Sequence, residues 1–417
     1  DSMTEILAAQ DTSIGPAGGR KNADVTAWVA VAAGALGAML ATLDISIVNS
    51  ALPVIQGEIG ATGAEGTWIA TSFLVAEIVV IPLSAWLERL FGLRTLLIIA
   101  VSAFTAFSVL CGVVTDLTTM IIGRTGQGFM GGVLIPTAMT IVAKRLPPHQ
   151  QPIGMALFGM TVVLGPVMGP LIGGWLTENL SWHYAFFVNV PVCALLLALL
   201  FIGLPHEKPD WVYLREADWA GIAGMILGLG GLTIVLEEGH REEWFDSTLI
   251  VQLTLMTVVG FALLTYGQLY ARKPVLKLRL MLSRQFASVV VMALALGMVM
   301  YGSTYVIPQF LAIISDYNAL QTGLVIFWMG VPAFLLMPVL PFMIRRIHIR
   351  IAVGAGMFIM ALSCFVSINL TAESGGGVFT ESQFLRGIGM ILTMMFLNQA
   401  TVASVAKEDA GDASGIF

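Results

Sequence analysis

The chain consists of long apolar stretches separated by short polar connections. Ten stretches of at least 18 residues carry no Asp, Glu, Lys or Arg: 95–115, 125–143, 146–177, 179–206, 219–236, 247–271, 285–315, 317–344, 351–372 and 387–406. Two more segments of spanning length, 25–57 and 66–87, each contain one carboxylate, Asp44 or Glu77. A helix crosses the hydrocarbon core with about 20 apolar residues and satisfies its own backbone hydrogen bonds there. The pattern therefore predicts twelve membrane-spanning helices.

Composition narrows the class of protein further. Only 11% of the 417 residues are charged and 57% are hydrophobic, whereas a soluble domain carries roughly 25% charged residues. A soluble protein of this composition could not cover its surface with polar groups, so soluble globular, disordered and nucleic-acid-binding proteins are excluded. We predict an all-α polytopic membrane protein, whose surroundings are the lipid bilayer.

The distribution of basic residues predicts an orientation. If the amino terminus, with Arg20 and Lys21, lies in the cytoplasm, alternation of sides places seventeen of the 20 basic residues in cytoplasmic segments. Arg241 then falls outside, and Arg124 and Arg386 fall within spans. Short connections rich in Lys and Arg remain on the cytoplasmic side. We therefore expect a multi-pass protein of the cell membrane with a cytoplasmic amino terminus.

Two polar segments mark the organisation of the chain. Residues 1–24 lack the apolar core of a signal peptide and are predicted to form a disordered cytoplasmic tail. The stretch 206–218 is rich in Pro, Trp and charge, which predicts a cytoplasmic linker. A first bundle of six helices is expected before it, at 25–205.

An internal repeat relates the fourth and twelfth predicted helices. Arg124 is followed by Lys144 after 20 residues, and Arg386 is followed by Lys407 after 21, with glycines just behind each arginine. Repeated halves are typical of transporters; the alternative is chance similarity between two glycine-rich helices. Two further helices follow Lys144, whereas the sequence stops at Phe417. By this analogy we predict that the chain is truncated, with two spans missing, and that the 417-residue form is inactive.

Four ionisable residues lie inside predicted spans: Asp44, Glu77, Arg124 and Arg386. A charge at the bilayer centre costs about 2.5–3.5 kcal/mol, so such residues usually face a partner or a water-filled cavity. Asp44 is the first candidate for a proton carrier, with Arg124 as the cation that holds its ionised form, and Glu77 is a second candidate. The alternative for Asp44 is a static ion pair that only fixes helix packing. Arg386 is also able to reach the outer interface with its long side chain.

One apolar stretch combines glycine and proline at six of ten positions. They are Gly165, Pro166, Gly169, Pro170, Gly173 and Gly174. Glycines four residues apart form a smooth face that permits close helix contact, and each proline removes a backbone hydrogen bond and bends the helix. The stretch predicts a helix that bends as a gate; tight packing alone is the alternative.

Motifs for cofactor and metal chemistry are absent from the sequence. It contains neither a phosphate-binding GxxxxGK[ST] loop nor an HExxH pair, which are the usual short signatures of such sites. Its three cysteines show no CxxC spacing. We therefore predict neither an enzyme nor a bound cofactor or metal.

Five segments carry a resemblance to the major facilitator superfamily, and within it to the fourteen-helix drug:proton antiporters of the EmrB/QacA type. They are 43–53 (LDISIVNSALP), 124–128 (RTGQG), 165–174 (GPVMGPLIGG), 182–191 (WHYAFFVNVP) and 218–221 (DWAG). The first resembles the family's first-helix signature and contains Asp44 and Asn49. The second, which contains Gln127, resembles the fourth-helix motif, and the third is similar to the antiporter motif.

The resemblance implies a particular fold and domain arrangement. Twelve spanning helices would be present of an expected fourteen. Two additional helices would follow the linker within 206–271, between the first bundle and an incomplete second bundle of four helices at 272–417.

The resemblance also implies an activity. The protein would export lipophilic drugs or toxic compounds across the inner (cytoplasmic) membrane by alternating access, driven by proton entry. Asp44 and Arg124 would lie in the coupling site. Together with the charges inside the spans, this predicts Asp44, Arg124 and Glu77 as proton-coupling residues and Asn49, Gln127 and Arg386 as residues of the substrate cavity or its motifs. Emr-type members work with a periplasmic adaptor and an outer-membrane channel.

One motif of the resemblance departs from the family pattern. The loop after the second helix usually carries Gly, Asp, Gly and basic residues. Here Ala85 replaces the first Gly, Arg89 stands where Asp is expected, and Glu88 precedes it, while Gly92 and Arg94 remain. The charge relay that this loop usually forms at the cytoplasmic face is therefore in question.

Alternatives remain open within and outside this class. The same motifs occur in exporters of a defined metabolite or lipid. The chain could also be a membrane-embedded receptor or the membrane subunit of an ATP-driven pump, although a receptor needs neither a carboxylate within the membrane nor a bendable glycine-rich helix.

Overall fold

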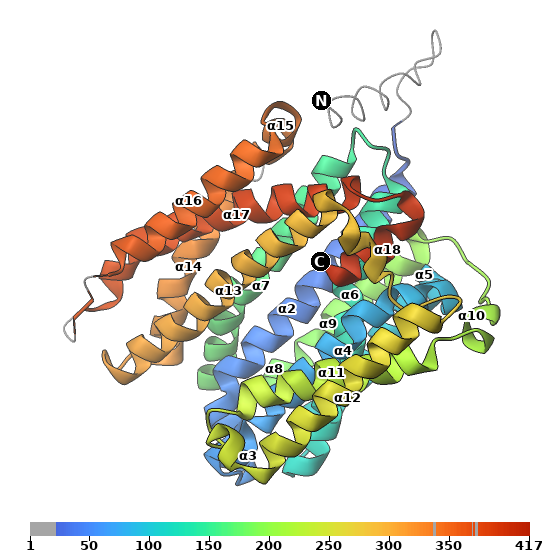
Figure 1. The fold of residues 1–417 in the computed structure, drawn as a ribbon. Coiled ribbons are helices and arrows are strands. Elements are labelled where there is room, and N and C mark those ends of the chain that lie inside the picture. The colour runs from blue at the N-terminus through green and yellow to red at the C-terminus, as the bar shows by residue number, and fades with distance from the viewer. Residues whose placement is uncertain (1–21, 337–338, 369, 372–373) are drawn as a thin grey trace.

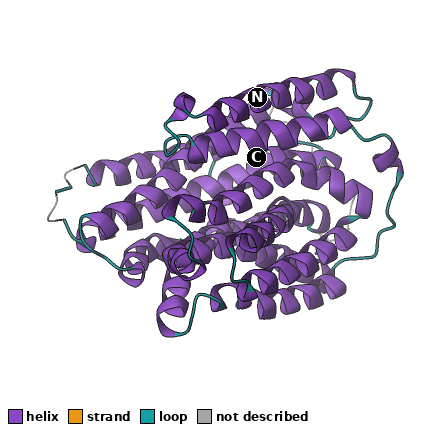
Figure 2. Ribbon diagram, turned by 90° about the horizontal axis from the view of Figure 1, so that it is seen from below, coloured by secondary structure: helices purple, strands orange, loops and turns teal. Residues whose placement is uncertain are grey.

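The computed structural model describes residues 22–336, 339–368, 370–371 and 374–417. Every regular element within these residues is helical, and Figure 2 shows helices joined by short connections. Residues 1–21 of the predicted tail lie outside the described residues. The all-α polytopic fold predicted from the sequence is confirmed.

From residue 22 up to the linker, the described chain forms eight helices. They are α2 (Val25–Ile59), α3 (Gly63–Gly66), α4 (Trp68–Phe91), α5 (Leu93–Val113), α6 (Leu117–Arg145), α7 (Gln151–Asn179), α8 (Tyr184–Phe187) and α9 (Asn189–Gly203). The linker and the segment after it contain α10 (Val212–Arg215), α11 (Trp219–Glu238), η1 (Trp244–Asp246), α12 (Thr248–Tyr270) and η2 (Leu278–Leu282). The remaining helices are α13 (Arg284–Ile313), α14 (Ala319–Leu336), α15 (Leu340–Arg346), α16 (Ile349–Val366), η3 (Gly376–Val378), α17 (Phe379–Ala403), η4 (Lys407–Asp409) and α18 (Ala410–Ile416).

Each of the twelve predicted spans contains a long helix. Ten helical segments of the described chain are long and apolar enough to cross a membrane, and α14 and α17 occupy the other two predicted spans. Two spans are not single helices. The stretch 179–206 is interrupted at Val188, between α8 and α9, and 317–344 holds both α14 and part of α15.

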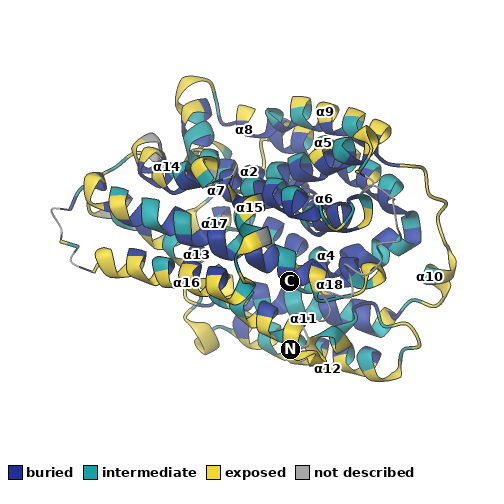
Figure 3. Ribbon diagram, turned by 90° about the horizontal axis from the view of Figure 1, so that it is seen from above, coloured by how far each residue is buried: buried dark blue, intermediate teal, exposed yellow. Residues whose placement is uncertain are grey.

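The helices pack around two main apolar cores. One core is built from α2, α4, α5, α6 and α9, and the other from α13, α14, α16 and α17. Figure 1 shows these two groups side by side, with α11 packed on α4 and α12 packed on α11. Figure 3 shows α12 at the edge of the molecule, where exposed residues are yellow. Helix α7 contributes to both cores, through Phe158 on one face and Val163 on the other. The division of the chain at 205 and 271 remains a prediction.

The glycine-rich face of α7 contacts a face of small hydroxyl residues on α2. A Cβ atom at each glycine would overlap one residue of α2, in the pairs Gly165–Thr42, Gly169–Ser46 and Gly173–Ser50. Both sets recur every four residues, so the two backbones lie in close contact over two helical turns. The opposite face of α7 contacts α14, where Gly330 lies against Val167. Helix α7 therefore joins the two groups of helices.

The helix α7 runs without interruption from Gln151 to Asn179 and includes Pro166 and Pro170. Gly174 is buried next to the contact face. The close packing predicted for this stretch is present, and its bending during transport remains a prediction.

The linker folds back onto the end of α4. The amide of Asp210 donates to the carbonyl of Leu90 at 2.9 Å, and Glu207 accepts from the amide of Leu93 at 2.8 Å. Gly92 turns the chain between α4 and α5 with φ of 77°, and a Cβ there would lie 2.8 Å from Glu207. A glycine is needed at this turn because other residues rarely adopt positive φ.

The α2–α7 contact yields a first prediction. In Gly169→Ala the added methyl overlaps Ser46, so the helices must separate; overpacking of this kind costs about 1–3 kcal/mol. We expect thermal unfolding of the detergent-solubilised protein, followed by tryptophan fluorescence, to shift several degrees lower. Gly354→Ala in α16 is the control, because nothing lies within 4 Å of its new methyl. Equal unfolding temperatures for the two variants would contradict this packing.

Candidate functional site

An ion pair lies in the interior of the first group of helices. Nη1 of Arg124, on α6, is 2.6 Å from Oδ2 of Asp44, on α2. The two side chains are 1% and 0% exposed. Neither charge contacts water in this conformation, so each depends on the other for compensation.

Further contacts hold the guanidinium of Arg124 in place. Its Nε donates to the carbonyl of Ile69 at 3.2 Å and its Nη1 to Oε1 of Gln127 at 3.0 Å. The guanidinium carbon lies 4.2 Å from the ring centroid of Phe73, within the range of a cation–π interaction. Because Ile69 and Phe73 belong to α4, these contacts join the arginine to α4 as well as to α2.

Amide donors cover the second oxygen of Asp44. Nδ2 of Asn189, the first residue of α9, donates to Oδ1 at 2.6 Å, and Nε2 of Gln127 lies 3.4 Å from it. Both amides also contact Oγ of Ser108 on α5, at 3.3 and 2.8 Å. All of these groups are buried. The carboxylate therefore has partners from α6 and α9, and the cluster is completed by α5.

Sequence reasoning paired Asp44 with Arg124 but assigned Gln127 to the substrate cavity or its motif, and it did not single out Asn189 or Ser108 as site residues. Asn189 lies within the segment 182–191, which resembles the family, so this resemblance could have identified it as a candidate site residue. The helix break at Val188 makes Asn189 the first residue of α9, which turns its amide towards Asp44. Ser108 carries no such signal, since a single serine in an apolar span resembles any other small residue.

Glu77 is buried on α4 but is not part of this hydrogen-bonded cluster. Its Oε1 has no hydrogen-bond partner among the described residues. Its charge acts on Asp44 and Arg124 and also on Tyr301 of α13. The coupling role of Glu77 remains a prediction.

The remaining predicted site residues lie apart from the pair. Arg386 on α17 is only 3% exposed, so it does not extend to the interface in this conformation. It donates to Gln383 at 3.1 Å, its Nε has no partner, and no carboxylate of the described chain pairs with it within 4.0 Å. Asn49 is exposed on α2. Substrate contact by these two residues remains a prediction.

The loop that departs from the family pattern nevertheless carries a charge network. Nη1 of Arg89 is 2.8 Å from Oδ2 of Asp412 on α18. Glu88 pairs with Lys144 of α6, and Lys277 pairs with Asp409. Ion pairs are thus present at this end of the helices, with an arginine on α4 and the aspartates beyond α17.

Comparison with known proteins identifies the family. The family model of the Major Facilitator Superfamily matches residues 34–417. The colistin resistance protein EmrB of Acinetobacter baumannii is 32% identical over 94% of this chain and 77% of its own length. This chain belongs to the major facilitator superfamily.

Other members of the superfamily show the same relationship. The multidrug export protein EmrB of Escherichia coli K12 is 31% identical over 91% of this chain and 74% of its own. The fatty acid resistance protein FarB of Neisseria gonorrhoeae is 31% identical over 90% of this chain and 73% of its own length. The superfamily is one of transporters rather than enzymes, so this chain is a multi-pass membrane transporter.

Solved structures of the superfamily share its fold. The human organic anion transporter MFSD10 superimposes with a TM-score of 0.63 at 16% identity, covering 94% of this chain and 89% of that one. The proton:xylose symporter XylE superimposes with a TM-score of 0.58 at 14% identity, covering 94% of this chain and 84% of that one. At these identities the likeness shows the fold alone.

The buried pair yields a second prediction, on stability. Asp44→Asn leaves the Arg124 charge buried without compensation, which should destabilise the transporter by about 3–5 kcal/mol. Adding Arg124→Gln removes that charge, so the double variant should recover part of the loss. Thermal unfolding of both single variants and the double variant measures the coupling. A double variant that loses the sum of the two single effects would show that the groups do not interact.

Proposed function

We propose that this transporter is a proton-coupled antiporter that exports lipophilic drugs or toxic compounds by alternating access. Its amino terminus would lie in the cytoplasm, and the proton gradient would supply the energy without a cofactor. The observation that carries this proposal is the buried Asp44–Arg124 pair, because paired ionisable residues inside a membrane-spanning bundle are typical of proton pathways in transporters.

Protonation of Asp44 would weaken one particular set of contacts. A neutral carboxyl group loses most of its attraction for the Arg124 guanidinium. The guanidinium would keep its contacts with Ile69 and Phe73 on α4 and with Gln127 on α6. Arginine would therefore stay with α4 and α6, while α2 is released. Because Asp44 is 0% exposed, the proton must arrive in another conformation, which is the behaviour that alternating access requires.

Release of α2 would be transmitted through α7. The small-residue faces of α2 and α7 are in backbone contact, and α7 lies against α14 of the second group. A shift of α2 therefore reaches the interface between the two groups without an intervening flexible side chain. Pro166 and Pro170 give α7 the capacity to bend as it moves.

Relatives support the substrate class. Their names refer to colistin resistance, multidrug export and fatty acid resistance. These names are consistent with substrates that are lipophilic or amphipathic. The fatty acid name favours a second candidate, the export of one defined amphipathic lipid. A periplasmic adaptor and an outer-membrane channel are further proposed partners, by analogy with Emr-type members.

A third prediction tests the coupling in vesicles reconstituted with the full-length transporter. Export of a lipophilic fluorescent dye should follow an imposed pH gradient and stop when a protonophore is added. Asp44→Asn should reduce gradient-driven export at least tenfold, because its side chain cannot exchange a proton. Glu178→Gln, which neutralises an exposed carboxylate at the end of α7, should transport normally.

Normal gradient-driven export by folded Asp44→Asn would remove Asp44 from the mechanism. Export that requires ATP and ignores the pH gradient would favour a pump instead. Competition between the dye and a panel of drugs and fatty acids separates broad drug export from export of one lipid.

A further inference from the structure

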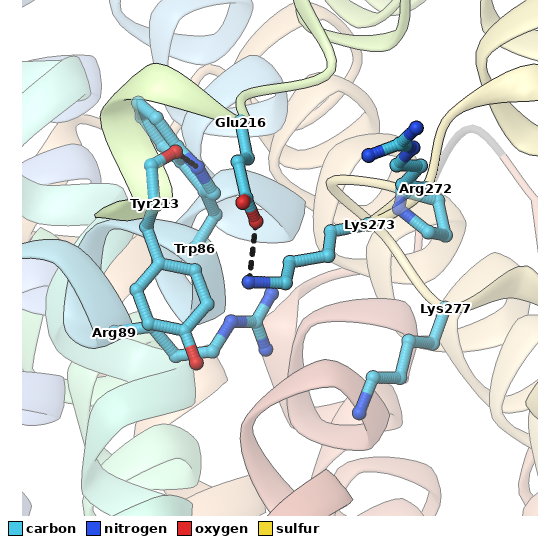
Figure 4. A pocket seen from close by; sticks show the side chains of 8 residues that line it. Trp86, Arg89, Tyr213, Glu216, Arg272, Lys273 and Lys277 are labelled. Carbon is cyan, nitrogen blue, oxygen red and sulfur yellow. Dashed lines mark hydrogen bonds and ion pairs between the residues drawn. The ribbon is translucent and has the colours of Figure 1, made fainter. Parts of the chain in front are cut away.

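A polar cavity of about 260 Å³ lies at the end of α4, away from the Asp44 cluster. It is bounded by the end of α4, by α10 of the linker and by the connection between α12 and η2 (Figure 4). Its walls include four cations and two aromatic rings. They are Arg89, Arg272, Lys273, Lys277, Trp86 and Tyr213. Glu216 supplies one negative charge, so the lining carries a net charge of about +3.

Internal pairing leaves part of this positive charge uncompensated. Arg89 and Lys277 pair with Asp412 and Asp409 outside the cavity lining. Arg272 forms no ion pair or hydrogen bond with another described residue, and Figure 4 shows it on the same side of the cavity as Lys277. An unpaired guanidinium in a cationic cavity is suited to bind an anion.

The Lys273–Glu216 pair is open to replacement. Both side chains are about half exposed, and exposed ion pairs contribute little to stability. Figure 4 shows Lys273 reaching across the cavity to Glu216. The Lys273 ammonium holds the pKa of the Glu216 carboxyl below its usual range, so the carboxylate remains ionised and occupies the place that another anion could take.

Aromatic residues contact two of the cations. Other aromatic residues nearby indicate the depth of the cavity in the membrane. The Tyr213 ring centroid lies 5.3 Å from Nζ of Lys273 and 5.9 Å from the guanidinium carbon of Arg89. On the last turn of α12, just before the cavity, Tyr266 and Tyr270 are exposed and their rings lie 4.8 Å apart. Exposed tyrosines at the end of a spanning helix lie at the headgroup level. The cavity therefore opens where lipid phosphates are found.

We propose that this cavity binds the phosphate of an anionic phospholipid headgroup. Arg272 and Lys273 would contact the phosphate directly, since guanidinium and ammonium groups are the usual phosphate ligands in proteins. Clusters of basic residues next to spanning helices commonly recognise anionic lipids. A bound headgroup would join α10 of the linker to the connection after α12. This site is separate from the proposed transport site and does not depend on the transport mechanism.

Lipid binding to the purified 417-residue chain in detergent tests this proposal. Native mass spectrometry would measure binding of phosphatidylglycerol, phosphatidylcholine and glycerol 3-phosphate separately. Phosphatidylglycerol should bind most tightly, and Arg272→Gln/Lys273→Gln should weaken its binding about 30-fold, because two basic contacts are lost. The control Lys208→Gln/Arg279→Gln removes two exposed basic residues outside the lining and should bind as the unmodified chain does.

Three results would overturn the proposal. Equal weakening by the control would show a general attraction to positive charge rather than a site. Equal affinity for phosphatidylcholine would show that the lipid's net charge is not recognised. Equal affinity for glycerol 3-phosphate would show that a soluble phosphate ester, and not a lipid, is the ligand.

Discussion

The Asp44–Arg124 pair holds together helices that are otherwise apolar. Removing two opposite charges from water is costly, and the cost is recovered only when they lie in contact and their remaining groups are hydrogen-bonded. Here Asn189 and Gln127 cover the carboxylate, and α4 supplies a carbonyl and an aromatic ring to the guanidinium. These contacts tie α2 to α4, α6 and α9 through one carboxyl group.

Close backbone packing between α2 and α7 determines which helices must move when α2 shifts. Bulky side chains between two helices can change rotamer, so that one helix shifts slightly without moving the other. The contacting faces of α2 and α7 carry only small side chains, which cannot accommodate a shift in this way. Helix α7 contributes to both apolar cores. In the mechanism that we propose, a proton on Asp44 would change the arrangement of the two groups of helices through these close contacts, as alternating access requires.

Much of the fold could be predicted because charged residues are rare within membrane-spanning segments. Stretches without charge gave the spans, and Asp44 and Arg124 stood out because insertion of each is costly. The same cost marks Glu77 and Arg386, for which the described residues offer no ion-pair partner within 4.0 Å. The insertion penalty therefore identifies candidate residues but does not say what each one contacts.

Other features carry no comparable signal. Neutral side chains such as Asn189 and Ser108 are only slightly unfavourable in a span, so the donors around Asp44 are not marked by composition. The Arg89–Asp412 pair joins residues 323 positions apart, and nothing in either local sequence specifies the other. Such contacts follow from how the helices pack, which the pattern of apolar residues leaves undetermined.

The protonation state of Asp44 is the most direct test of the mechanism. Infrared difference spectroscopy on the reconstituted transporter, with ¹³C-labelled aspartate, would follow the carboxyl stretching band as the pH is lowered. We expect a band of protonated aspartate to appear over the pH range in which gradient-driven export operates, and to be absent from Asp44→Asn. If Asp44 stays ionised throughout that range while export continues, the pair is a static structural contact and the proton takes another route.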